Sequence, residues 1–375
     1  MVLSDTQAGF RDAVCAYSQE RIRPRAAEFE AAGAYPSELF AELASLGVMG
    51  MTAPLAVGGA GADYVSYAAA LIELAAADGA LSTIVSIQNG IIIPGILKDG
   101  SSAQQQRFLP SLIGGQSIGA FALTEAAAGS DAAAIRTRAT RTCGGWHVNG
   151  SKQFVTSGRT AGLAMITTVT DPAAGKKGMS VFLVPTDRPG YVVEKVEHKL
   201  GQRASDTCAL RFEDLFVESD LLLGKEGQGY RIALSNLEVG RIGIAAQSIG
   251  MAQAALDIAV AYAKDRRSMG KPIIKHQAVG FRLADLAARV ESARQLLLHA
   301  ACLKDHGLPC VKEASMAKLV ASEAAEAICS GAIQTLGGYG YMEEFGLAKI
   351  YRDVRVCQIY EGTSDVQRMI IARSL

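Results

Sequence analysis

The sequence has no excess of charge of either sign and no cysteine pattern typical of a metal site. Lys plus Arg and Asp plus Glu each number 37 in 375 residues, so the formal net charge is zero. Without a basic excess the chain has little with which to neutralise nucleic acid or an anionic membrane, and a small molecule or a protein is the expected partner. The seven cysteines form no CxxC pair, and we expect no set of cysteines and histidines with the spacing of a metal site. We therefore expect no metal and reduced thiols in a cytosol-like compartment.

Long apolar runs and nucleotide-binding glycine motifs are also missing. No segment is expected to stay apolar for the ~20 residues of a membrane span, and Asp5, Arg11 and Asp12 precede any apolar run. A soluble protein without a cleavable leader is expected, in the bacterial cytoplasm or, if eukaryotic and processed, in the mitochondrial matrix. No GxGxxG opens a helix after a strand, which disfavours a Rossmann sheet and a nicotinamide cofactor.

What the sequence does contain is a hydrophobic period that changes twice. Residues 1–119 follow helical spacing broken by Gly and Pro, residues 120–227 hold short strand-like segments between turns, and residues 228–375 return to long helical patterns. At 49% hydrophobic residues the chain can bury more than one core. The prediction is a mainly α fold with a β domain: an N-terminal α-helical domain (1–119), a middle antiparallel β-barrel or sandwich (120–227) and a C-terminal four-helix bundle (228–375).

One short segment near the C-terminus is the most informative for chemistry. Tyr360-Glu361-Gly362-Thr363-Ser364 places a carboxylate between the largely apolar stretch 354–360 and a turn that can open a helix. When an apolar ligand removes water from such a carboxylate, its pKa rises toward the range of an efficient base, so we interpret Glu361 as a catalytic base. The pentapeptide alone leaves an alternative open. Ser364 and Gln367 match a capping box, and a Glu ahead of a helix is commonly an exposed partner of the helix dipole.

Four further segments occur in a fixed order before this one. They are Phe121-Ala122-Leu123-Thr124-Glu125 with Ala128-Gly129-Ser130-Asp131, then residues 152–158, then Asp265-Arg266 with Gly270, Pro272 and Gln277, then residues 334–341. Together with residues 360–364 they resemble the signatures of the acyl-CoA dehydrogenases, and the resemblance covers essentially the whole chain. The segment 238–245 is most similar to that of short-chain and short-branched-chain members.

The resemblance implies FAD as the cofactor and hydride acceptor. It implies FAD contacts at Phe121, Leu123, Thr124, Ser130, Phe154, Val155, Thr156, Arg266, Gln277, Gln334, Gly337, Gly338, Thr363 and Asp365. Arg266 would meet the pyrophosphate, and Gln277 with Gly337 and Gly338 would reach a cofactor held by a neighbouring subunit, in a homotetramer made of two dimers. Without the motifs, the alternative for Arg266 is a surface ion pair with Asp265. The alternative for Phe154 is the ordinary packing of a strand side chain.

The implied reaction is α,β-dehydrogenation of a short, straight or branched acyl-CoA. Glu361 would take the α proton while its backbone N–H and a flavin hydroxyl hold the thioester oxygen. The implied substrate contacts are Ser130, Glu238, Arg241 and Gly362. The alternative for Arg241 is an ion pair with Glu238 at a helix start. Gly240 stands where some relatives carry their catalytic Glu.

Some positions depart from the family pattern, and some alternatives stay open. Ala126, Phe154, Ser157 and Met269 replace the common Pro, Trp, Asn and Phe, which changes packing around the flavin edge without removing a required group. Electron-transfer flavoprotein is the expected electron acceptor, in fatty acid or branched-chain amino acid catabolism. The alternatives are an acyl-CoA oxidase, a dehydrogenase of a carrier-protein-bound acyl thioester, and a noncatalytic helical scaffold.

Overall fold

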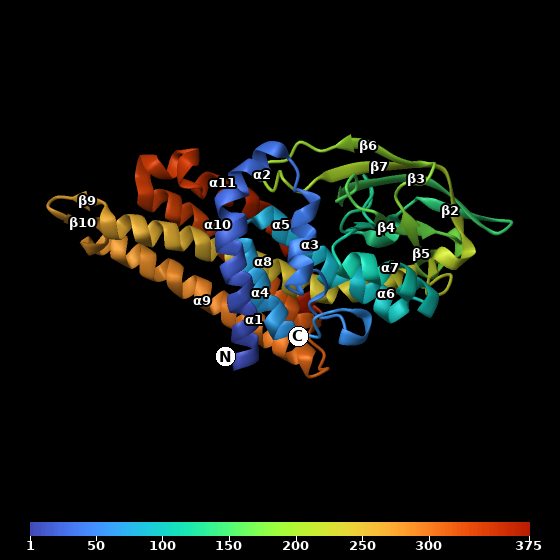
Figure 1. Ribbon diagram of the computed structural model, residues 1–375, viewed down its shortest axis with the longest axis horizontal. Coiled ribbons are helices and arrows are strands. Elements are labelled where there is room, and N and C mark those ends of the chain that lie inside the picture. The colour runs from blue at the N-terminus through green and yellow to red at the C-terminus, as the bar shows by residue number, and fades with distance from the viewer.

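The structure is a computed structural model that describes residues 1–375, the side chain of Asn236 excepted. Helices form both ends of the chain, and a sheet lies between them in sequence and to one side in space (Figure 1). This arrangement confirms the predicted order of helices, strands and helices in a mainly helical protein with a central β domain.

The first part of the chain is helical. Its α-helices are α1 (Asp5–Tyr17), α2 (Ala26–Ala32), α3 (Ser37–Ser45), α4 (Tyr64–Ala77), α5 (Gly79–Ile87), α6 (Ile93–Asp99) and α7 (Ser102–Ile113). Carboxylates fix where the two central helices begin: Asp63 accepts the N–H of Ser66, and Asp78 accepts those of Ala80 and Leu81. Almost every residue of α4 and α5 is buried, so these two are core helices.

The middle of the chain forms one mixed sheet. Its strands are β1 (Gly119–Ala122), β2 (Arg138–Thr142), β3 (Gly145–Thr156), β4 (Leu163–Val169), β5 (Met179–Pro185), β6 (Tyr191–Val196), β7 (Thr207–Glu218) and β8 (Leu222–Leu223). The order is β6-β7-β3-β2-β4-β5-β8, and β1 pairs with β4. The prediction of a purely antiparallel sheet is wrong at two places, because β1 runs parallel to β4 and β2 meets β4 in one parallel pair. A long connection separates these strands, which parallel pairing requires.

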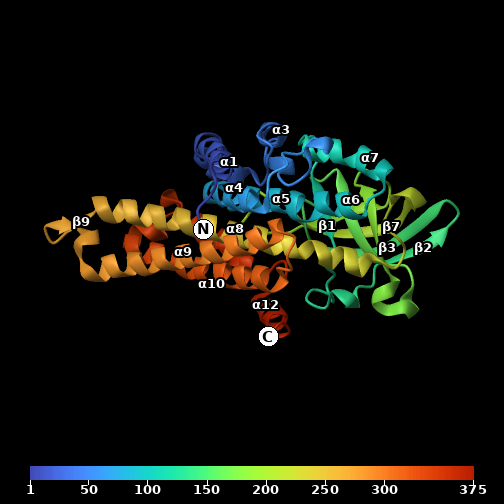
Figure 2. The same ribbon diagram turned by 90° about the horizontal axis from the view of Figure 1, so that it is seen from below.

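Three long helices dominate the last part of the chain. They are α8 (Gly229–Asp265), α9 (Gln277–Asp305) and α10 (Val311–Leu336), followed by the short α11 (Leu347–Val354) and α12 (Ser364–Ala372). The long helices extend together away from the sheet, and a hairpin of β9 (Arg267–Ser268) and β10 (Lys271–Pro272) forms their tip (Figures 1 and 2). At its other end α8 reaches the sheet, so one helix links the two parts of the molecule.

Two helical stretches, Gly79–Asp99 and Gly229–Asp265, are long and apolar enough to cross a membrane by length and composition. The expectation that no segment is so apolar is therefore wrong. In their most apolar windows 89% and 72% of the residues, respectively, are buried inside the protein, which is what the core helix of a large domain shows.

Candidate active site

Glu361 lies in a strained turn that leads into α12. Its φ is +51°, and that of Gly362 is +93°. A left-handed conformation at a non-glycine residue costs about 1–3 kcal/mol and persists only where surrounding contacts hold it. Thr363 Oγ1 accepts the N–H of Val366 at 3.3 Å, so Thr363 is the N-cap. The alternative of a capping box formed by Ser364 and Gln367 is wrong, because the cap lies one residue earlier.

Buried side chains hold the backbone of this turn. Gln367 Nε2 donates to the carbonyl oxygens of Glu361 at 3.2 Å and Gly362 at 2.9 Å. Lys318 Nζ, from α10, donates to the same Gly362 oxygen at 2.7 Å. Both Gln367 and Lys318 are fully buried. These contacts offset the strain and fix the direction in which the Glu361 side chain leaves the chain.

A second set of contacts fixes the residue before Glu361. The Tyr360 hydroxyl donates to Gln247 Oε1 at 2.8 Å and accepts from Gln202 Nε2 at 3.4 Å. Gln202 belongs to the loop before β7, and it also donates from its side chain to the Asp353 carbonyl at 3.2 Å and from its backbone to the Asp353 carboxylate. The helix α8, the β domain and α11 therefore all contribute to the position of Tyr360.

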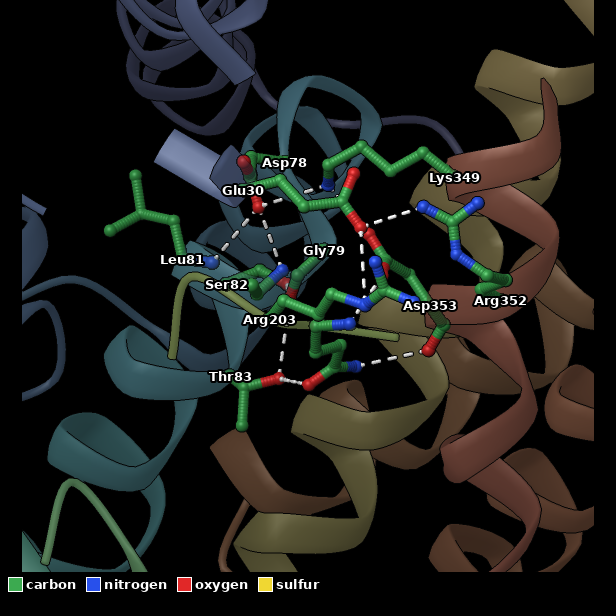
Figure 3. Close-up of polar contacts among 12 residues, drawn as sticks. Glu30, Asp78, Gly79, Leu81, Ser82, Thr83, Arg203, Lys349, Arg352 and Asp353 are labelled. Atoms are coloured by element: carbon green, nitrogen blue, oxygen red, sulfur yellow. Dashed lines mark hydrogen bonds and ion pairs between the residues drawn. The ribbon is translucent and has the colours of Figure 1, made fainter. Parts of the chain in front are cut away.

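Asp353 is itself part of a cluster of charges, drawn in Figure 3. Lys349 Nζ lies 2.6 Å from Asp353 Oδ2 and 3.7 Å from Asp78 Oδ1, and Arg352 Nη2 lies 2.7 Å from Glu30 Oε1. Asp78 and Asp353 are buried, so each carboxylate needs a cation close by. The cluster joins α2 and α5 to α11, and through Asp353 to the turn.

The Glu361 side chain lies against α8. A Cβ placed on Gly240 would overlap Glu361 Oε2 and stand 2.8 Å from its Cδ, so only glycine leaves room for the carboxylate there. Among the described residues Oε2 is buried and has no hydrogen-bond partner. Burial raises the pKa of Glu361 to about 7, with Arg241 and Lys318 acting in the opposite direction. A carboxylate in this state suits proton transfer near neutral pH.

Arg241, on α8, is a cation that acts on this carboxylate. It is buried, and its Nε has no partner among the described residues. Burial lowers the pKa of Arg241, against the influence of Glu361 and Glu238. Glu238 instead accepts from Lys304 Nζ at 3.2 Å and Cys310 Sγ at 2.8 Å. The alternative of a helix-start pair with Glu238 is therefore wrong, since α8 begins well before both residues.

The structure brings together the two segments predicted to hold the flavin ring. Lys152 Nζ donates to the Leu123 carbonyl at 2.9 Å and to Glu125 Oε1 at 2.8 Å. The Gln153 N–H donates to the Thr124 carbonyl at 2.8 Å. Lys152 is fully buried, and burial lowers its pKa to about 8 although Glu125 opposes this. A buried ion pair thus fixes the end of β1 against β3.

Phe154, in the second of these segments, has an unusual backbone conformation and an unusually exposed side chain. Its φ is +57° and its side chain is 64% exposed, so ordinary strand packing is the wrong interpretation. Val155 is buried, Phe121 and Thr156 are half-buried, and Ser130 is exposed. An exposed ring beside hydroxyl and backbone groups suits a planar heterocycle, so these residues fit an isoalloxazine.

The remaining predicted FAD residues lie elsewhere. Arg266 follows α8, with its guanidinium 5.8 Å from the centre of the Tyr339 ring, and it makes no ion pair with Asp265 among the described residues. Gln277, Gln334, Gly337 and Gly338 are exposed, and Gly338 directly precedes the Tyr339 that lies beside Arg266. The 25 residue steps from Arg241 in α8 to Arg266 at its C-cap span about 37 Å at roughly 1.5 Å per residue. One chain therefore does not bring this group to Glu361.

Other site residues have different roles or were not predicted. Asp365 is exposed and pairs with Arg368 at 3.3 Å.

The sequence did not predict a role at the site for Lys318, Gln367 and Gln202. A signal existed for Lys318, since it follows Ala314 by four residues and precedes Ala321 by three on a predicted apolar face.

Comparisons with known proteins identify the family. Three family models match: the N-terminal domain of acyl-CoA dehydrogenase over residues 4–116, the middle domain over 120–215 and the C-terminal domain over 227–375. The chain belongs to the acyl-CoA dehydrogenase family. This confirms the resemblance seen in the sequence and makes the chain an oxidoreductase of an FAD-binding family.

Individual acyl-CoA dehydrogenases match over almost their whole length. A Bacillus subtilis protein named acyl-CoA dehydrogenase is 44% identical over 375 residues, which cover 100% of this chain and 99% of the relative. The human mitochondrial short-chain specific acyl-CoA dehydrogenase is 44% identical over 359 residues, covering 96% and 87%. The structure of butyryl-CoA dehydrogenase from Megasphaera elsdenii matches with a TM-score of 0.97 at 39% identity, covering 100% and 99%.

Proposed function

We propose that this acyl-CoA dehydrogenase acts on short-chain acyl-CoA, straight or branched, with Glu361 as the base and FAD as the hydride acceptor. The observation that carries the proposal is the Glu361 carboxylate, which is buried at Oε2, unpartnered among the described residues and shifted in pKa to about 7. The short-chain name of the human relative and the name butyryl-CoA dehydrogenase of the Megasphaera structure support the acyl length.

The chain supplies a base and a donor for the thioester oxygen. Glu361 removes the α proton, and its carboxylate is held ready by the turn and by the space at Gly240. Bound FAD would supply the acceptor for the hydride that leaves the β carbon. The backbone N–H of Glu361 makes no hydrogen bond among the described residues, so it is free to donate to the thioester oxygen. That interaction strengthens as negative charge develops on the oxygen.

Arg241 is proposed to hold the CoA portion of the substrate. Its unpartnered Nε supports this role, because a buried guanidinium donor without an acceptor costs stability until a ligand provides one. Ser130, Glu238 and Gly362 complete the proposed substrate contacts. Glu238 acts through its present partners Lys304 and Cys310, which hold it beside Arg241 on α8.

The proposed FAD site is shared between subunits. One chain contributes Phe121, Leu123, Thr124, Ser130, Phe154, Val155, Thr156, Thr363 and Asp365, and its neighbour contributes Arg266, Gln277, Gln334, Gly337 and Gly338. The separation of about 37 Å along α8 supports this division, because it places Arg266 far from Arg241 and from the Glu361 carboxylate on which Arg241 acts. The proposed assembly is a homotetramer made of two such dimers.

The domain boundaries, the electron acceptor and the cellular location are also proposed. The proposed domains are 1–119, 120–227 and 228–375, the middle one a β-barrel or sandwich and the last one a four-helix bundle. Electron-transfer flavoprotein is the proposed electron acceptor, and catabolism of fatty acids or branched-chain amino acids the proposed pathway. Bacterial and mitochondrial relatives support a cytoplasmic or matrix location.

Anaerobic mixing with acyl thioesters tests the function. The purified yellow protein is mixed with acyl-CoA esters of increasing chain length and branching, and bleaching of the flavin is followed. The fastest bleaching is expected with four- and five-carbon chains. Carrier-protein thioesters and oxygen uptake are the comparison arms. Bleaching only by carrier-bound substrates, or fast reoxidation by oxygen, would replace the proposal with one of its alternatives.

The bleaching rate is expected to rise with pH through a midpoint near 7. Burial raises the pKa of Glu361 to about 7, and only the ionised carboxylate can accept the α proton. Below the midpoint the second-order rate constant of the free enzyme falls about tenfold per pH unit. The measurement is stopped-flow reduction across the pH range, with FAD content as the control. A rate constant that stays level across the midpoint contradicts the assignment.

A further inference from the structure

Lys318 is a cation in a place that favours an apolar side chain. It lies on the face of α10 that carries Ala314, Ala317 and Ala321, and it is fully buried. Burying an ammonium group costs several kcal/mol, and a well-packed apolar residue at such a site is often as stable or more stable. Packing alone therefore gives no reason for a lysine here.

The contact that Lys318 makes is with the turn that carries the base. Its Nζ donates to the Gly362 carbonyl at 2.7 Å, and Gln367 donates to the same oxygen at 2.9 Å. We propose that Lys318 is a positioning residue for the reaction, whose ammonium group holds the Gly362 carbonyl and thereby keeps Glu361 in its left-handed, reactive position. This inference rests on the proposed role of Glu361 as the base.

Lys318 also acts on Glu361 through its positive charge. Its ammonium group faces Cys357, Glu361, Arg241 and Glu323. Burial lowers the pKa of Lys318 to about 8, although Cys357 and Glu361 oppose this shift. At neutral pH the group is still mostly a cation.

The titratable groups that face the Glu361 carboxylate are Arg241, Lys318 and Tyr67. Both cations favour ionised Glu361, so removal of either raises the pKa of the base. Lys318 thus contributes hydrogen bonding, which sets geometry, and charge, which sets the pH at which the base works. Gln367 contributes hydrogen bonding alone.

Three variants separate these contributions. Lys318→Met removes both the hydrogen bond and the charge, Gln367→Met removes only hydrogen bonds, and Lys312→Met, on the same helix but partly exposed, is the control. For each, bleaching by butyryl-CoA is followed against pH, together with FAD content and the thermal unfolding midpoint.

Lys318→Met is expected to lower the maximal bleaching rate by about tenfold or more and to move the midpoint of the pH profile upward by about half a unit. Gln367→Met is expected to lower the rate without moving the midpoint. Lys312→Met should match the wild type in both. The thermal midpoint of Lys318→Met should stay close to that of the wild type, since the Gly362 carbonyl keeps its hydrogen bond from Gln367 and Arg241 still acts on Glu361.

An unchanged rate and midpoint in Lys318→Met would overturn the inference, as would a loss of thermal stability with normal kinetics. If Lys318→Met does not fold, Lys318→Arg replaces it, with a lower rate and an unmoved midpoint as the expected result and an upward-shifted midpoint as the contrary one. Bleaching of the wild type is established first. A wild type that no acyl thioester bleaches refutes the proposed function, whereas a wild type that bleaches beside an unaffected Lys318→Met refutes only the role of Lys318.

Discussion

Glu361→Gln is expected to lower the rate of flavin bleaching by acyl-CoA by about 10³- to 10⁴-fold, because it removes the proton acceptor and keeps the size of the side chain. The contacts that hold the turn reach the backbone of residues 361 and 362, from Gln367 and Lys318, so they survive the substitution. The variant should therefore stay yellow and still bind the thioester. Anaerobic stopped-flow measures the rate, and equilibrium titration measures binding.

Two further measurements make this test specific. Glu344→Gln, at an exposed position, is the matched control and should bleach at the wild-type rate. The folded-state pKa of Glu361 is raised from 4.5 to about 7, so the wild type loses stability relative to the glutamine variant as pH rises through that window. A glutamine variant that bleaches within tenfold of the wild type would remove Glu361 from the role of base. A stability difference that does not grow with pH would contradict its buried state.

The order of helical and strand-like regions could be predicted because the spacing of hydrophobic residues within a short segment indicates whether that segment is a helix or a strand. The long stretch free of Gly and Pro at 282–306 lies almost entirely within α9, and 180–184 lies within β5. Parallel pairing of β1 with β4 could not be predicted, since either direction buries the same alternating side chains. The apolar character of α8 was underestimated although it is a property of the sequence itself, whereas the burial of most of its apolar window depends on the fold.

The candidate site shows the same division between local and tertiary information. The Gly-Thr-Ser turn correctly indicates a helix start after Glu361, but not whether Thr363 or Ser364 caps it, since both hydroxyls suit the role. The meeting of Leu123 with Lys152 depends on the fold and is invisible in sequence order. The same is true of the distance between Arg241 and Arg266, which motifs in the right order do not reveal.

Gly240→Ala is expected to lower the bleaching rate by about a hundredfold while leaving the protein folded. The new methyl group would overlap Oε2 of Glu361 and crowd its Cδ, so the carboxylate must turn away. Because the displaced atoms are the end of a flexible side chain, the folded state adapts at little cost. Alanine inside α8 also gains about 1 kcal/mol of helix propensity over glycine. Stopped-flow reduction and thermal unfolding measure the two effects separately.

The same substitution elsewhere supplies controls with opposite outcomes. Gly250→Ala, also on α8, would drive a methyl group into the Ile72 carbonyl oxygen and to 2.8 Å from Ala75 Cβ, so it should lower stability. Gly9→Ala, in α1, meets nothing within 4 Å and should leave the rate unchanged. If Gly240→Ala instead bleaches at the wild-type rate, the carboxylate does not need its place against α8. A loss of stability like that of Gly250→Ala would show that the backbone, and not Glu361, is what Gly240 accommodates.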